Sequence, residues 1–159
     1  MSGLAGAGPL VLELGLGLLM LLVFFVGLFM PSPDKRRVGV LAGIGLVLLF
    51  GLSWRVEAGA ELFGGAFVQD ELALFAKRLF ILATLIGVLA SLPLKAVAFA
   101  RRATEYYLAI LASLLGMLVL SSARDLVLLF VAFELMSIPL YYLAGFLKRE
   151  PEAVEAALK

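Results

Sequence analysis

The sequence predicts an all-α fold, a polytopic bundle of transmembrane helices, and three observations support that prediction. Of its 159 residues, 64% are hydrophobic and 16% are charged, compared with about 45–50% and about 25% in soluble domains. The apolar residues form continuous runs of roughly the 20 residues that a helix needs to cross a hydrocarbon core about 30 Å thick. These runs lack the alternation of apolar and polar residues that barrel strands show.

The first three predicted spans have distinct ends. Residues 9–30 begin at a proline and stop at the charged segment PSPDKRR. Residues 38–54 are rich in glycine and end at Trp54, a residue type that favours the membrane interface. Residues 72–92 end before Pro93, and the residue that precedes a proline is disfavoured in the helical conformation.

Two further spans and the start of a sixth helix complete what we expect to be one membrane domain over residues 1–159. The fourth and fifth spans cover residues 106–122 and 126–146. The closing segment KREPEAVEAALK predicts a helix from Pro151 onward, because proline is favoured at the first helical position. The segment LPLKAVAFARRATEYY before the fourth span indicates either a short helix along the interface or a solvated linker.

The basic residues predict the orientation, because cytoplasmic loops of membrane proteins carry an excess of Lys and Arg. The loops after the second and fourth spans hold only Arg55 and Arg124. We therefore expect a multi-pass protein of the cell (inner) membrane with its N-terminus outside and the loops after spans one, three and five in the cytoplasm. Those three loops hold Lys35, Arg36, Arg37, Lys95, Arg101, Arg102, Lys148 and Arg149.

Composition also excludes several kinds of function. The sequence has no cysteine and no histidine, so thiolate and imidazole ligands for metals, haem attachment and iron–sulfur ligation are excluded. A net charge of +1 argues against nucleic-acid binding, which needs a concentrated basic patch. The N-terminal GLAGAG follows no predicted strand and so lacks the context of a dinucleotide site.

Glu134 is the main candidate for chemistry. It is the ninth residue of its span, about 12 Å along the helix at 1.5 Å per residue. A carboxylate near the helix centre costs about 2.5–3.5 kcal/mol on insertion scales, so it is expected to face the bundle interior or a water-filled cavity. Ser137, Tyr141 and Lys148 follow it at helical spacing and predict a polar stripe toward the cytoplasmic end.

Pro139 strengthens this interpretation. A proline inside a helix lacks an N–H and clashes with the carbonyl four residues earlier, here that of Leu135. We expect a kink and a freed carbonyl beside Glu134, which together with the stripe can hold a short chain of waters. Glu134 then either handles protons or ions, the default interpretation of an intramembrane acid, or only bonds a neighbouring helix and fixes the packing.

The other ionisable residues of the spans give weaker signals. Lys77 and Arg78 lie about two turns into the third span and are expected to snorkel to the outer interface, as is Glu13 in the first span. If Lys77 instead faces the bundle, it becomes a proton relay or a partner for an acid. Lys159 lies on the emerging sixth helix, where it is either a further proton-transfer residue or part of an ordinary solvated helix start.

Residues 105–159 resemble the fourth, fifth and early sixth helices of the antiporter-like membrane subunits of respiratory complex I. The similarity is greatest to the N-type chains of bacterial NADH:quinone oxidoreductase, counterparts of mitochondrial NADH dehydrogenase subunit 2. The markers are LGMLVLSSARDLVLLFVAFELMSIPLYYLAGF and the closing EAALK, with FELMSIPLY the most specific. Glu134 matches the family's proton-transfer acid in helix five, and Lys159 matches a lysine that opens helix six. VQDELALFAKRLFILATL resembles the third helix more loosely.

The resemblance implies a translocase subunit that couples quinone reduction elsewhere in the complex to proton movement. It implies no redox centre or cofactor in this chain, since NADH, flavin, iron–sulfur clusters and quinone are bound by other subunits, and it implies partners among the membrane-arm subunits. A subunit of a sodium/proton antiporter or of a membrane-bound hydrogenase remains an alternative, because these share the helix set. A structural membrane subunit without ion transfer is a third.

Family members have about fourteen helices, including two inverted repeats, and this sequence supplies five and the start of a sixth. The lysine of helix seven, the usual partner of Glu134, and the lysine of the broken helix beyond it lie outside the sequence. We therefore expect a part of a longer protein, and we do not expect these 159 residues to pump protons in isolation.

The predicted orientation can be tested by labelling. An amine reagent that does not cross membranes should modify Lys35 and Lys148 only when it is added from the cytoplasmic side, because both lie in loops assigned to that side. Inverted and right-side-out vesicles give the two arms of the measurement. Modification of either lysine from the outer side alone would overturn the orientation.

Overall fold

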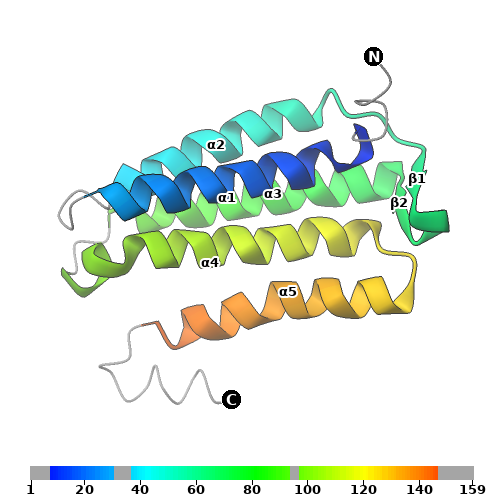
Figure 1. Cartoon of the computed structure of the whole chain (residues 1–159). Helices are drawn as coiled ribbons and strands as arrows, with labels where there is room; N and C mark the ends of the chain where they lie inside the picture. The colour runs from blue at the N-terminus through cyan, green and yellow to red at the C-terminus, as the bar shows by residue number, and fades with distance from the viewer. Residues whose placement is uncertain (1–7, 31–36, 94–96, 147–159) are drawn as a thin grey trace.

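A computed structural model describes residues 8–30, 37–93 and 97–146 of the chain. Successive α-helices run in opposite directions and form a bundle (Figure 1). A short 3₁₀ turn, η1 (Gly8–Leu10), leads into the first helix. The helices are α1 (Val11–Phe29), α2 (Arg37–Ser53), α3 (Glu71–Ser91), α4 (Val97–Ser122) and α5 (Leu126–Ala144).

The predicted membrane character holds in its general form. Within the described residues, four helical segments are long and apolar enough to cross a membrane: Gly8–Phe29, Glu71–Ser91, Arg102–Ser122 and Leu126–Ala144. The helix α2 is shorter, with 17 residues, and falls just below that length. Large apolar side chains cover much of the outer surface of the bundle, as expected where lipid is the solvent.

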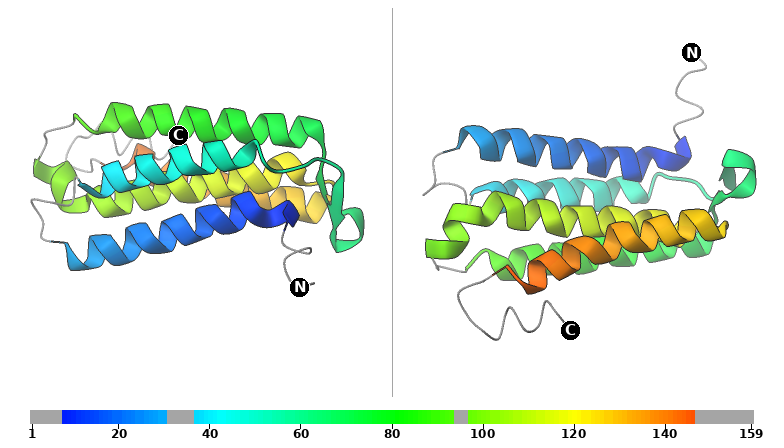
Figure 2. Two further views of the ribbon diagram at one scale, coloured as in Figure 1. Left: turned by 90° about the horizontal axis from the view of Figure 1, so that it is seen from above. Right: turned by 60° about the horizontal axis from the view of Figure 1, so that its bottom comes forward.

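The described chain is mostly helical, as predicted, and it also contains one short hairpin that the sequence analysis did not predict. A two-stranded antiparallel hairpin connects α2 to α3 and consists of β1 (Ala60–Leu62), the turn η3 (Phe63–Gly65) and β2 (Phe67–Gln69). Figure 2 shows this hairpin at the end of the bundle where α3 begins and α4 ends. The Arg124 N–H donates to the Ala66 carbonyl at 2.8 Å, so the hairpin is tied to the α4–α5 connection. Strands of three residues are too short to show an alternating pattern in the sequence.

The segment before the fourth predicted span is helical from Val97 onward, so α4 begins earlier than residue 106. Helical geometry is interrupted at Arg102, where φ is −117° and ψ is 15°. The described part of this segment is therefore a short helix, as the first alternative predicted, and not a linker. It is joined to the remainder of α4 across a kink at Arg102.

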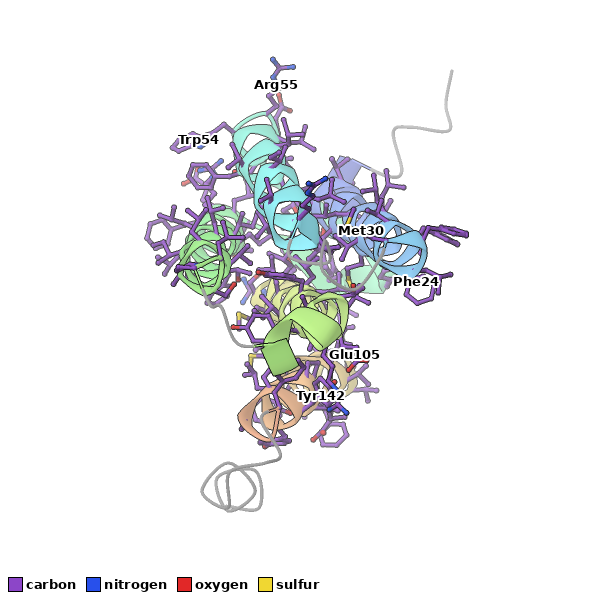
Figure 3. The ribbon with its side chains drawn as sticks, turned by 90° about the vertical axis from the view of Figure 1, so that its left-hand side faces the viewer. Phe24, Met30, Trp54, Arg55, Glu105 and Tyr142 are labelled. Carbon is purple, nitrogen blue, oxygen red and sulfur yellow. The ribbon has the colours of Figure 1, made fainter. Side chains whose placement is uncertain are left out.

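The helix α4 is the centre of the bundle. It packs against α1, α2, α3 and α5, while α1 and α3 each also pack against α2. Seen end-on in Figure 3, α4 lies between α5 and the other three helices. The buried core joins apolar residues from α1 to α4, among them Leu12, Leu16, Leu46, Ile81, Leu111, Leu114 and Leu118.

The helix α5 is held by an unusually close contact with α4. Gly116 faces the α5 backbone, and a Cβ atom at this position would clash with the Met136 nitrogen. The Ser113 hydroxyl donates a hydrogen bond of 3.0 Å to the Met136 carbonyl. Small residues allow membrane helices to approach in this way, and polar side chains then bond across the contact.

Two aspartates fix the helix starts beside the hairpin. Asp70 caps α3 by accepting from the Ala73 N–H at 2.7 Å, and it forms an ion pair with Arg124. The Ala73 hydrogen bond first, and then the Arg124 guanidinium, hold the pKa of the Asp70 carboxyl below its ordinary value, although burial acts against them. Asp125 caps α5 by accepting from the N–H groups of Val127 and Leu128.

The α4–α5 contact predicts a strong effect of a single methyl group. Gly116→Ala should destabilise the protein by about 1–3 kcal/mol, the usual range for overpacking, because the α5 backbone must move away. Gly87→Ala is the matched control, since nothing lies within 4 Å of a Cβ atom there. Unfolding of the purified variants by SDS titration measures the difference. Equal stability of the two variants would contradict the close contact.

Candidate functional site

Glu134 lies midway along α5 and is partly exposed. Ala132, two residues earlier, is 1% exposed, and α5 packs chiefly against α4. Two residues turn an α-helix by about 200°, so Glu134 points to the side of α5 opposite α4. This differs from the expected position inside the bundle. The reason is that α5 is the outermost helix of the described bundle, and no second described helix packs extensively on that side.

The residues of the predicted polar stripe differ in how far they are exposed to solvent. Ser137 is buried, and its hydroxyl lies 3.5 Å from the Glu134 carbonyl, at the limit of a hydrogen bond. Tyr141 is 61% exposed. The α-helix continues through Pro139 to Ala144, so the expected kink does not interrupt the helix. Lys148, at the end of the stripe, lies outside the described residues.

Lys77 does not snorkel to the interface. Its side chain is fully buried, and Nζ lies 2.6 Å from Oε1 of Glu13 on α1. It also donates a hydrogen bond of 2.8 Å to Oε1 of Gln69. A buried ammonium group is stable only when paired and hydrogen-bonded, and both conditions are met here. The alternative that Lys77 faces the bundle and pairs with an acid is therefore the correct one.

Glu13 likewise does not snorkel outward. It is 8% exposed, although it lies in the first turn of α1. The attraction of Lys77 across the bundle outweighs solvation at the interface, since an unpaired Lys77 would be left in the core. Its other carboxylate oxygen, Oε2, accepts no hydrogen bond from the part of the chain that the structure describes.

The hairpin completes the environment of this ion pair. Gln69 is fully buried, and its Nε2 lies 3.4 Å from the Glu57 carbonyl in the exposed connection before β1. The Phe67 ring lies 4.9 Å from Lys77 Nζ, close enough for a cation–π contact. The sequence analysis did not assign any role to Gln69 or Phe67. In the sequence, nothing sets these two residues apart except their position: Gln69 lies two residues, and Phe67 four residues, before the start of α3, which carries the buried Lys77.

Arg78 follows the expected behaviour more closely. It reaches the end of α2, where its Nη2 donates a hydrogen bond of 3.1 Å to the Ser53 carbonyl. Its guanidinium group stacks over the Trp54 ring at 4.4 Å. Lys77 and Arg78 are adjacent on α3 but point in different directions. Lys77 enters the bundle interior, whereas Arg78 packs over the end of α2.

The structure separates the predicted proton-transfer residues. Lys77 belongs to the buried cluster of Glu13, Lys77 and Gln69. Glu134 stands apart on α5, and among the described residues it makes no ion pair. Lys159 lies outside the described residues. In a buried pair of opposite charges, a proton can pass from the cation to the carboxylate. A carboxylate without such a partner can bind a proton and release it. Together these features define a multi-pass membrane protein with ionisable groups at two places within its helices.

Comparison with known proteins agrees with this class. Residues 123–159 match the family model described as the transmembrane region of NADH:quinone oxidoreductase and Mrp antiporters. Over 96% of its length, the chain is 34% identical to NADH-quinone oxidoreductase subunit N of Rhodospirillum rubrum. It is 37% identical over 74% of its length to subunit N 2 of Rhizobium meliloti, and 33% identical over 87% to the F(420)H(2) dehydrogenase subunit N of Methanosarcina mazei.

These matches confirm the resemblance noted from the sequence: over most of its length the chain is similar to part of the antiporter-like membrane subunits of NADH-quinone oxidoreductase. It spans between a quarter and a third of the length of these relatives, namely 32%, 25% and 30% of the three proteins named above. The family model covers α5, on which Glu134 lies.

The buried ion pair predicts that the double substitution destabilises the bundle less than either single substitution does. Lys77→Met or Glu13→Gln alone should destabilise the bundle by about 3–5 kcal/mol, because each leaves a buried group without its partner. The double variant should regain most of that loss, since neither charge remains. SDS unfolding of the three variants tests this double-mutant cycle. Additive losses in the double variant would show that the two side chains do not interact.

Proposed function

We propose that the chain is part of a proton-translocating membrane subunit of an NADH:quinone oxidoreductase, and that Glu134 is its central protonatable group. The observation that supports this proposal most directly is the position of Glu134. It lies mid-helix on α5, inside the segment that matches the antiporter family model. Intramembrane carboxylates mark ion pathways by default, because a group without function would be too costly to retain there.

In this proposal Glu134 takes up a proton from one side and releases it toward the other. The neutral carboxyl group is favoured in an apolar setting, while a cation brought close favours the charged form. Because α4 covers the opposite side of α5, the carboxylate is free to meet a cationic partner from a further helix. Lys159 and Lys77 are the proposed further proton-transfer residues of this chain, with Lys77 acting through Glu13.

The proposal includes the finer points of place and partners. The chain spans the cell membrane five times, with its N-terminus outside, and it assembles with other membrane-arm subunits. It binds no cofactor itself, and electron transfer takes place in other subunits. One relative is a subunit of F(420)H(2) dehydrogenase, so the electron donor is set by a different part of the complex in this view.

One alternative has a specific observation in its favour. The matching family model is described for Mrp antiporters as well as the oxidoreductase, which favours a sodium/proton antiporter subunit as the second candidate. A membrane-bound hydrogenase subunit shares the same helix set. A purely structural role for Glu134 would require a packing partner, and no hydrogen bond or ion pair of its side chain occurs within the described residues.

Proton pumping by the assembled complex tests the proposal. Glu134→Gln should reduce pumping by roughly a hundredfold, the scale of losing one acid–base group, while assembly stays near normal because the shape is kept. Glu134→Asp should retain part of the rate. Proton uptake into inverted vesicles per NADH oxidised gives the measurement.

Glu61→Gln is the matched control, because Glu61 is an exposed carboxylate on β1 outside the membrane helices. It should pump like the unmodified complex. A Glu134→Gln complex that assembles and pumps at the normal rate would exclude proton transfer by this carboxyl. A normal proton yield with lost sodium transport would favour the antiporter alternative.

A further inference from the structure

The hairpin of β1, η3 and β2 covers one end of the space between α1, α3 and α4. Its first strand contacts the η1 turn at the start of α1, and its second strand contacts both α3 and α4. Phe67 of β2 also pairs with Ala123, the residue after the end of α4, in an isolated antiparallel bridge. The ion pair of Glu13 and Lys77 joins α1 to α3, two of the helices that the hairpin covers.

The ion pair lies close to the hairpin end of the bundle. Glu13 is in the first turn of α1, and Lys77 follows the start of α3 by six residues, about 9 Å at 1.5 Å per residue. One turn further inward, Leu16 and Ile81 are fully buried members of the apolar core. Water that approaches the pair therefore meets an apolar core on the inner side and the hairpin on the outer side.

Gln69 is the residue that joins the hairpin to the ion pair. Its Oε1 accepts the 2.8 Å hydrogen bond from Lys77 Nζ, and its Nε2 lies 3.4 Å from the Glu57 carbonyl. An ammonium group only donates, so the amide must present its oxygen to Lys77 and its NH₂ group to the chain before β1. Because Glu57 is exposed, these contacts form a polar link from the buried lysine to the surface.

Two features make local opening of the hairpin easier than unfolding of the helices. Its strands have three residues each, and a two-stranded hairpin is at best marginally stable by itself. Oε2 of Glu13 and Oγ of Ser122, which precedes Ala123, are buried and have no hydrogen-bond partner among the described residues. Opening lets water reach both atoms, which favours the open state. Segments of such low stability open while the rest of the structure stays folded.

We propose that the hairpin is a gate for the Glu13–Lys77 pair, and that Gln69 is the positioning residue that keeps it closed. When the gate opens, Gln69 leaves Lys77, and water from the hairpin side reaches the ammonium group, which gives a proton to water and later regains one from it. When the gate closes, Gln69 holds the ammonium group against Oε1 of Glu13 again. The inference rests on the role proposed for Lys77 in proton transfer, and it adds the side of the membrane with which Lys77 exchanges protons.

Chemical modification of Lys77 measures the opening without relying on proton pumping. The assembled complex, in right-side-out and in inverted vesicles, is treated with a water-soluble amine reagent that does not cross membranes. Mass spectrometry of the peptide that contains Lys77 then gives the rate. We expect slow modification from one side only, opposite to the side from which Lys35 reacts. The reason is that α1 ends and α2 begins at the end of the bundle opposite the hairpin (Figure 1).

Gln69→Met is the decisive variant, because it keeps the length of the side chain and removes the hydrogen bond to Lys77. It should speed the modification of Lys77 from the hairpin side about tenfold or more, the factor that one hydrogen bond to a charged group supplies. Glu61→Gln is the matched control, since Glu61 is exposed on β1 of the same hairpin. It should leave the rate unchanged.

Arg124→Gln weakens the gate at a point that does not touch Lys77. It removes the ion pair with Asp70 at the base of the hairpin. Because an exposed ion pair is weak, we expect the modification of Lys77 to become faster by up to about fivefold. This variant decides the question where Gln69→Met prevents assembly of the complex.

Two results would overturn the gate. The first is a rate of modification that neither Gln69→Met nor Arg124→Gln raises. The second is faster modification from the Lys35 side or equally from both sides, since the bundle as a whole would then have loosened. Failure of the proposed proton transfer is recognised separately. If the double variant Glu13→Gln, Lys77→Met pumps at the normal rate, exchange of protons through this pair is wrong, whatever the labelling shows.

Discussion

The ion pair between Glu13 and Lys77 is the interaction on which the arrangement of the bundle depends. It joins α1 to α3, two helices that pack mainly on α2 and α4 and only slightly on each other. Because both side chains are buried, separating the helices would leave two charges without partners, which is far more costly than losing an apolar contact. The position of the hairpin follows from the same pair, since Gln69 and Phe67 surround the ammonium group.

A second constraint acts at α4. Four helices use this one as their common surface, and α5 reaches it through the small side chain of Gly116. Because of that close approach, one side of α5 packs against α4. The opposite side, which carries Glu134, makes no extensive contacts within the described residues. The packing that holds α5 thus also determines which way its carboxylate points.

The sequence predicted the helices well and the polar contacts poorly. Continuous apolar runs and interrupting prolines are local signals, so they located the helical segments. The partner of Lys77 is not a local property: the position of this lysine on α3 indicated only two possible orientations, and Glu13 on α1 determined which one is adopted. The hairpin was missed because three-residue strands carry no periodicity. For Glu134, the depth along the helix could be predicted from its place in the span, whereas its direction depends on where α4 lies.

Glu13 and Glu134 both lie within membrane helices, but only Glu13 has a cationic partner among the described residues. This difference indicates different roles for the two carboxylates. Glu13 already has its cation and a fixed position, so a change in its protonation would break a bond that holds two helices together. Glu134 has no such bond within the described residues, so its protonation can change without loss of packing. A group that must cycle between charged and neutral forms is better placed where the structure does not depend on its charge. By this argument the proposed proton exchange at Glu134 can proceed without a change in packing, whereas the proposed transfer through Lys77 and Glu13 would be tied to the contact between α1 and α3, the helices that position α4 and through it α5.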